Sequence, residues 1–135
     1  MSDYVKLVVL GSCATGKTCI INRLVYNEFK PDVPIVKESA SEQYKFVYEE
    51  FNGRELVLNL WEASGLLKYK SLSKIFCKDS GIAILVYDIT SKYSFEELKS
   101  EWLPLLHDCG IVDASKEINF FNLYKYIYSY WDSCE

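Results

Sequence analysis

Residues 11–18, GSCATGKT, form the part of this chain whose residue types and spacing could do chemistry most directly. They fit the pattern G-x-x-x-x-G-K-[ST] and lie between a short apolar run and a helical pattern. Gly11 and Gly16 allow backbone conformations in which successive N–H groups surround a phosphate at a helix N-terminus. Lys17 supplies a cation to the β- and γ-phosphates, and the hydroxyl of Thr18 can bind Mg²⁺. The pattern favours phosphate binding over a chance glycine-rich turn.

A second stretch, residues 61–66 (WEASGL), places an acid at the end of an apolar run and before three small residues. The small residues are typical of a loop that approaches a ligand closely. The side chain that follows them, Leu66, has neither a hydrogen-bond donor nor an acceptor. The alternative is that the hexapeptide is an ordinary strand end.

Composition limits the classes to which the chain can belong. A length of 135 residues favours one domain, and 50% hydrophobic residues with 25% charged residues are typical of a packed globular protein. A net charge of -4 argues against a nucleic-acid partner, which would attract a basic surface. The five cysteines are scattered without a C-x-x-C pair, so neither a disulfide framework nor a zinc site is expected. The absence of a signal-peptide pattern and of a long apolar run predicts a cytoplasmic protein.

Apolar runs and turn residues predict the strands. Residues 4–10 are short and rich in β-branched side chains, and residues 44–61 form two strand-like arms around Asn52-Gly53, a strong hairpin signal. Residues 81–89 are continuously apolar, which predicts a strand covered on both faces. Residues 30–43 contain prolines and many charges without a period, which indicates a long exposed loop.

Helices are predicted over residues 16–26, 67–77 and 94–108. Ser94 and Glu97 fit a capping box at the start of the last helix, and Pro104 should kink or shorten it. Helices that alternate with strands predict an α/β fold of three layers.

These motifs resemble the Ras superfamily of small GTPases, and within it the Rab branch. The resemblance runs from about Tyr4 to about Leu106 and rests on GSCATGKT, NEFKPD, LNLWEASGLLKYKSL, LVYDIT and SFEELKSEWL. It implies a P-loop NTPase fold of the small GTPase type, with a mixed sheet and an antiparallel hairpin. Residues 1–135 would form a single small GTPase-like domain, in which residues 1–108 are the family-like core and residues 109–135 a divergent aromatic tail. The usual last strand and helix would be lacking.

The resemblance assigns roles to individual residues. Gly65 would meet the γ-phosphate through its N–H, and Phe29 would pack against guanine, although a plain core position for Phe29 is almost equally consistent with the sequence. The implied nucleotide-binding residues are Gly11, Ser12, Cys13, Ala14, Thr15, Gly16, Lys17, Thr18, Phe29 and Gly65.

The implied Mg²⁺ site consists of Thr18, Ser39 and Glu62. Ser39 occupies the position of the family's switch threonine by a count back from Trp61, whereas a slip of one residue in the hairpin would put Ala40 there. Leu66 stands where the family uses glutamine to orient the attacking water, so no catalytic residue is assigned and hydrolysis is expected to be weak.

The C-terminal residues depart most from the family. No N-K-x-D motif follows Leu106, so no residue is assigned to reading the guanine base. Tyrosines alternate at strand spacing in the tail. This pattern is as consistent with self-association through a sheet edge as with a binding surface. Cys134 is neither paired nor four residues from the end, so no lipid anchor is expected.

Two functions follow from the resemblance. The first is a Rab-like switch in vesicle traffic that binds GTP or GDP with Mg²⁺ and contacts effectors and exchange factors through its switch loops, with peripheral association at endomembranes through those partners. The second is a degenerate pseudo-GTPase that acts as a protein interaction module without nucleotide. The intact residues 11–18 favour the first function, whereas the altered switch residues and the missing guanine motif favour the second. A P-loop kinase or ATPase is disfavoured by YDIT.

Overall fold

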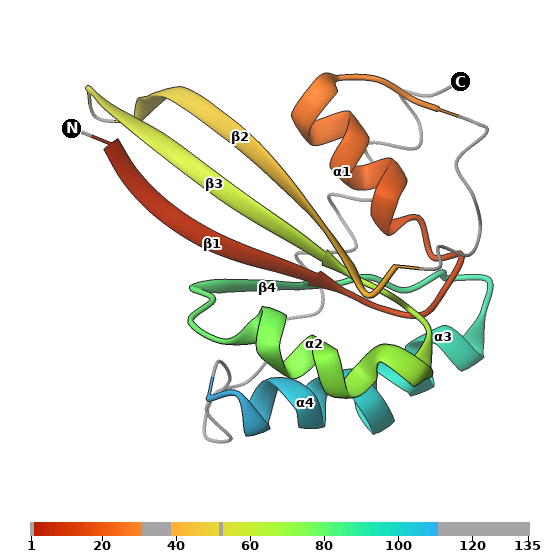
Figure 1. Cartoon of the computed structure of the whole chain (residues 1–135). Coiled ribbons are helices and arrows are strands. Elements are labelled where there is room, and N and C mark those ends of the chain that lie inside the picture. The colour runs from red at the N-terminus through yellow and green to blue at the C-terminus, as the bar shows by residue number, and fades with distance from the viewer. Residues whose placement is uncertain (1, 31–38, 52, 111–135) are drawn as a thin grey trace.

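A computed structural model describes residues 2–30, 39–51 and 53–110 of the chain as helices packed on both faces of a sheet (Figure 1). The sheet has the order β2-β3-β1-β4, with β1 (Ser2–Leu10), β2 (Ser41–Phe51), β3 (Arg54–Ala63) and β4 (Ile82–Leu85). β2 and β3 are antiparallel, whereas β1 runs parallel to both β3 and β4. The predicted α/β fold, with its mixed sheet and hairpin, is confirmed.

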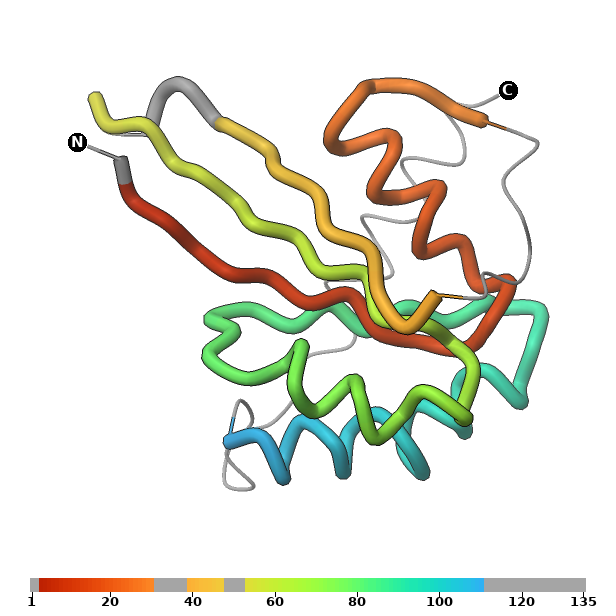
Figure 2. Tube along the Cα trace, viewed as in Figure 1, coloured from red at the N-terminus to blue at the C-terminus, as the bar shows by residue number. Residues whose placement is uncertain are grey.

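Helix α1 (Lys17–Tyr26) lies on one face of the sheet, and α2 (Lys70–Cys77), α3 (Lys92–Glu97) and α4 (Leu103–Asp108) lie on the other. A 3₁₀ turn, Leu67–Tyr69, precedes α2, and a π-helical segment, Leu98–Trp102, joins α3 to α4. The Cα trace shows the chain passing from β1 through a loop, residues 11–16, into α1, and from β3 through the 3₁₀ turn into α2 (Figure 2). None of the helices in the described ranges has the length and apolar character needed to span a bilayer.

The strand β1 supplies apolar side chains to both faces, because alternate residues of a strand point to opposite sides. On the α1 face, buried side chains form one core cluster: Leu7, Val9, Ile21, Leu60 and Val86. On the other face, a second cluster consists of Val8, Leu10, Ala63, Cys77, Leu85, Leu98, Trp102, Leu105 and Leu106. Both faces of the first strand are therefore covered, which fixes the position of the loop that follows Leu10.

Two predicted boundaries are wrong. β4 ends at Leu85 instead of continuing to residue 89, and it is the last strand of the sheet among the described residues. Ile82 is 45% exposed and Ile89 51% exposed, so this run is not covered on both faces throughout. At the other end of the sheet, β2 begins within the predicted loop because residues 41–43 pair with the end of β3. Residues 31–38 of that loop, and residues 111–135 of the aromatic tail, lie outside the described residues.

The predicted capping box at Ser94 is also wrong. The N-cap of α3 is Ser91, whose side chain accepts a hydrogen bond from the Ser94 N–H. The Ser94 hydroxyl instead contacts the backbone of Asp88 and Ser91, and Glu97 lies at the last position of α3. Pro104 does not end the helix: it is the second residue of α4, and α4 follows the π-helical segment. A proline lacks the N–H for the normal helical bond, which is consistent with the altered turn before it.

Candidate phosphate-binding site

The loop between β1 and α1 has a shape that depends on its glycines. A Cβ on Gly11 would lie 2.2 Å from the carbonyl oxygen of Val86, so no side chain fits there. Gly16 is the N-cap of α1 and has a φ of 91°, a conformation that favours glycine. The Thr15 hydroxyl donates a hydrogen bond of 2.8 Å to the carbonyl of Ser12 across the loop. The loop thus leads into the helix N-terminus in a compact, internally bonded form.

Lys17 lies over this loop. Its Nζ donates hydrogen bonds to the carbonyl oxygens of Gly11, at 2.9 Å, and Ser12, at 2.7 Å. The residue is only 6% exposed, and a buried ammonium requires such partners. The cation is therefore held at the place where the motif predicts a bound phosphate.

The first turn of α1 meets the end of β3 through two side chains. The hydroxyl of Thr18 donates a hydrogen bond to Oε1 of Glu62, and Glu62 is 6% exposed. The structure thus brings together two of the three predicted Mg²⁺ ligands from positions 44 residues apart. Ser39, the third, is half-buried two residues before β2 and is not part of this contact.

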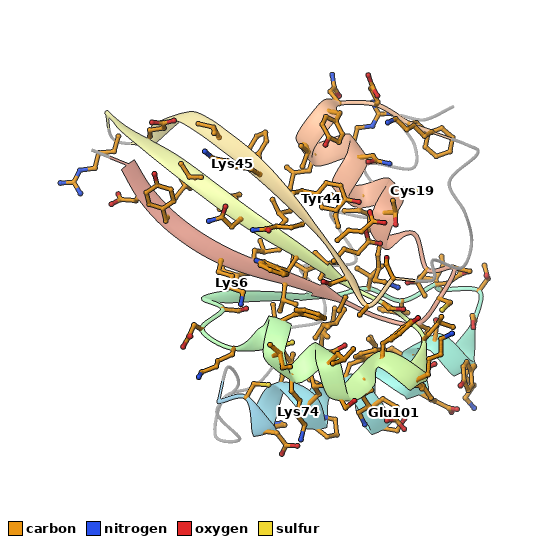
Figure 3. All side chains as sticks on the ribbon, viewed as in Figure 1. Lys6, Cys19, Tyr44, Lys45, Lys74 and Glu101 are labelled. Atoms are coloured by element: carbon orange, nitrogen blue, oxygen red, sulfur yellow. The ribbon has the colours of Figure 1, made fainter. Side chains whose placement is uncertain are left out.

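Sequence reasoning missed two residues beside Glu62. Glu42 is paired with Glu62 across β2 and β3, and Tyr44 follows on the same side of the sheet, toward α1 (Figure 3). The Tyr44 hydroxyl donates to Oε2 of Glu42 at 2.7 Å and lies 3.3 Å from Oε2 of Glu62. Burial, followed by the hydrogen bond to Glu42 and the negative charge of Glu62, raises the pKa of Tyr44 far above its usual value. Tyr44 therefore remains a hydrogen-bond donor between two carboxylates.

A hydroxyl and a carboxylate are hard oxygen ligands, so Thr18 and Glu62 fit a magnesium ion by their chemistry. No group of three or more His, Cys, Asp or Glu side chains within the described ranges could hold a metal ion by itself. Mg²⁺ commonly takes its remaining ligands from water and substrate phosphates. The pair next to the phosphate loop would therefore hold the ion together with a bound nucleotide, which would supply phosphate oxygens.

The loop after β3 packs directly on the phosphate loop. A Cβ on Gly65 would lie 2.4 Å from the backbone nitrogen of Cys13, so glycine is required by close approach. Leu66 is half-buried, and its N–H donates to the Ser64 hydroxyl at 3.1 Å. Phe29, predicted to contact a base, follows α1 and is 48% exposed, so it is not a core residue.

A parallel strand that leads through a glycine-rich loop into a helix defines the class of P-loop proteins. Comparison with protein-family models then specifies the family: the Ras family model matches residues 6–117. The chain belongs to the Ras family.

The relatives found among curated proteins place it near the Rab branch. The chain is 40% identical over 101 residues to the Ras-related protein Rab-5B of Dictyostelium discoideum, covering 75% of this chain and 45% of that protein. It is 35% identical over 103 residues to the GTP-binding protein ypt4 of Schizosaccharomyces pombe, covering 75% and 44%. It is 32% identical over 108 residues to human Ras-related protein Rab-30, covering 76% and 50%. The chain is thus Rab-like and spans about half the length of these relatives.

Proposed function

We propose that this chain is a Rab-like GTP-binding switch that acts in intracellular vesicle traffic and binds GTP or GDP with Mg²⁺. The observation that carries the proposal is the arrangement of Lys17 over the phosphate loop beside the contact between Thr18 and Glu62. A cation for phosphates and an oxygen pair for a metal lie next to one helix N-terminus, as Mg²⁺-nucleotide binding requires. A relative of similar sequence is named a GTP-binding protein.

In this proposal, residues 11–18 enclose the phosphates, Gly65 presents its N–H to the γ-phosphate, and Phe29 contacts the guanine. Thr18, Ser39 and Glu62 hold the magnesium ion. Hydrolysis is weak because Leu66 cannot orient the attacking water. The two switch loops contact effectors and exchange factors, which bring a cytoplasmic protein to endomembranes.

Equilibrium binding of fluorescent GDP, GTP and ATP to the full chain, with Mg²⁺ and with EDTA, tests the proposal. Tight binding that requires Mg²⁺ and prefers guanine would support it. A folded, monomeric sample that binds none of these nucleotides would contradict it. That result would favour the second function, a pseudo-GTPase whose role lies in protein contacts.

A further inference from the structure

Ser12 connects the phosphate loop to a helix that carries no predicted nucleotide-binding residue. Its hydroxyl donates a 2.6 Å hydrogen bond to Oε2 of Glu97, and both residues are buried. Its carbonyl oxygen accepts from Nζ of Lys17 at 2.7 Å and from the hydroxyl of Thr15 at 2.8 Å. A single residue therefore links the last residue of α3 to the cation over the loop.

The position of Glu97 is fixed by its burial and by the contacts of α3. It is 5% exposed at the end of α3, and the beginning of α3 is bonded to the segment after β4 through Ser94 and Asp88. The next residue, Leu98, is fully buried in the core. The helix thus cannot shift easily relative to the sheet, and neither can the carboxylate that it carries.

A buried carboxylate is costly unless it accepts hydrogen bonds, so Glu97 needs the donors that face it. The Ser12 hydroxyl is such a donor. The negative charge of Glu97 also raises the pKa of the exposed Tyr93. Hydrogen bonds to a charged group are stronger than neutral ones, and the contact with Ser12 is short.

We propose that Glu97 is a positioning residue for the phosphate loop, which holds the Ser12 carbonyl where it can retain the Lys17 ammonium. The inference rests on the proposed nucleotide binding and names a residue outside the loop on which that binding depends. Glu97 acts through Ser12: the bond to the hydroxyl holds the serine in place and so restrains the carbonyl attached to the same Cα. Without this bond, Ser12 could rotate, and Lys17 would lose one of its two carbonyl partners in the loop.

The test is the affinity of the full chain for fluorescent GDP in the presence of Mg²⁺. Glu97→Ala and Ser12→Ala should each raise the dissociation constant about tenfold, because each removes one charge-assisted hydrogen bond. Glu97→Gln should restore most of the affinity, since its amide oxygen can still accept from the Ser12 hydroxyl. The double variant should bind no more weakly than either single variant, because both changes break the same bond.

Glu96→Ala is the matched control. Glu96 is an exposed acid of the same helix and forms a surface ion pair of 3.6 Å with Lys92. Its replacement should leave the dissociation constant for GDP unchanged. Thermal unfolding without nucleotide separates a structural effect from positioning. If Glu97→Ala does not fold, the GDP affinity of Ser12→Ala tests the proposal, because this variant removes the same hydrogen bond from the side of the loop.

The inference is overturned if these variants lower the melting temperature but leave the dissociation constant unchanged, or if Ser12→Ala and Glu97→Ala add in the double variant. In that case the original chain still binds GDP and the proposed function stands. If the original chain binds no nucleotide, both the proposed function and this inference fail.

Discussion

Thr18 and Glu62 are joined by a hydrogen bond, so the first turn of α1 is fastened to the end of β3. Both side chains offer oxygen atoms, and the resemblance to small GTPases predicts that they bind one magnesium ion. The side chain of Glu62 reaches the Thr18 hydroxyl from the end of β3. The predicted metal-binding role of Glu62 can be tested by measuring how strongly GDP binding depends on Mg²⁺.

Glu62→Gln should reduce the contribution of Mg²⁺ to GDP binding, because the amide retains the shape of the side chain but not the charge that attracts the ion. We expect the ratio of dissociation constants measured in EDTA and in Mg²⁺ to fall about tenfold. Glu55→Gln, an exposed change on the same strand, is the control. An unchanged ratio in Glu62→Gln would remove this residue from the metal site.

Lys17→Ala should weaken GDP and GTP binding about a hundredfold, since it removes the buried ammonium that would face the phosphates. The measurement is a fluorescence titration beside a check of the folded state by circular dichroism. Lys45→Ala changes an exposed lysine on β2 and should leave the affinity as it is. Equal affinities for the Lys17 variant and the original chain would show that this loop does not bind phosphate.

Gly65→Ala should disturb the phosphate loop, because the added methyl group would lie 2.4 Å from the Cys13 nitrogen. We expect weaker nucleotide binding together with a loss of about 1–3 kcal/mol in the free energy of unfolding, as for other overpacked sites. Gly81→Ala is the matched comparison, since its methyl group would meet Val5 at an ordinary 3.6 Å. Urea unfolding of both variants measures the difference, and equal stabilities would argue against the close approach.

Leu66→Gln restores a side chain that can hydrogen-bond a water molecule, and it should raise the rate of GTP hydrolysis. Single-turnover measurement with bound GTP is the suitable assay, because it excludes nucleotide exchange. Leu66→Asn provides a control, with the same amide on a shorter side chain. If neither variant hydrolyses GTP faster than the original chain, Leu66 does not limit hydrolysis.

Tyr44→Phe should destabilise the fold by about 1–2 kcal/mol, as expected for a half-buried hydrogen bond to a charged partner. Glu42 and Glu62 face each other in register and would lose the hydroxyl that lies between them. Tyr26→Phe removes the hydroxyl of an exposed tyrosine and should be neutral. Chemical unfolding compares the two variants, and a neutral Tyr44→Phe would mean that the carboxylates do not depend on the phenol.

The sequence predicted the parts of this site that follow from local pattern. The spacing in residues 11–18 located Lys17 and Thr18, and the resemblance placed Glu62 beside them. It did not predict Tyr44 or Glu42, because their proximity to Glu62 depends on the register of β2 against β3. Glu97 was assigned to a helix cap, since the spacing of serine and glutamate fits that motif. Its actual partner, Ser12, lies 85 residues away, and no local pattern reveals such a contact.

The ring of Trp61 stacks on Phe76 of α2, with centroids 5.7 Å apart, and Trp61 immediately precedes Glu62. The indole thus links the strand that carries Glu62 to the helix that follows the loop of Gly65. Trp102, by contrast, is fully buried in the core. In a Trp131→Phe background, Trp102 would contribute a constant fluorescence signal. A change in intrinsic fluorescence on addition of nucleotide would then report movement of α2 against Trp61, without an added label.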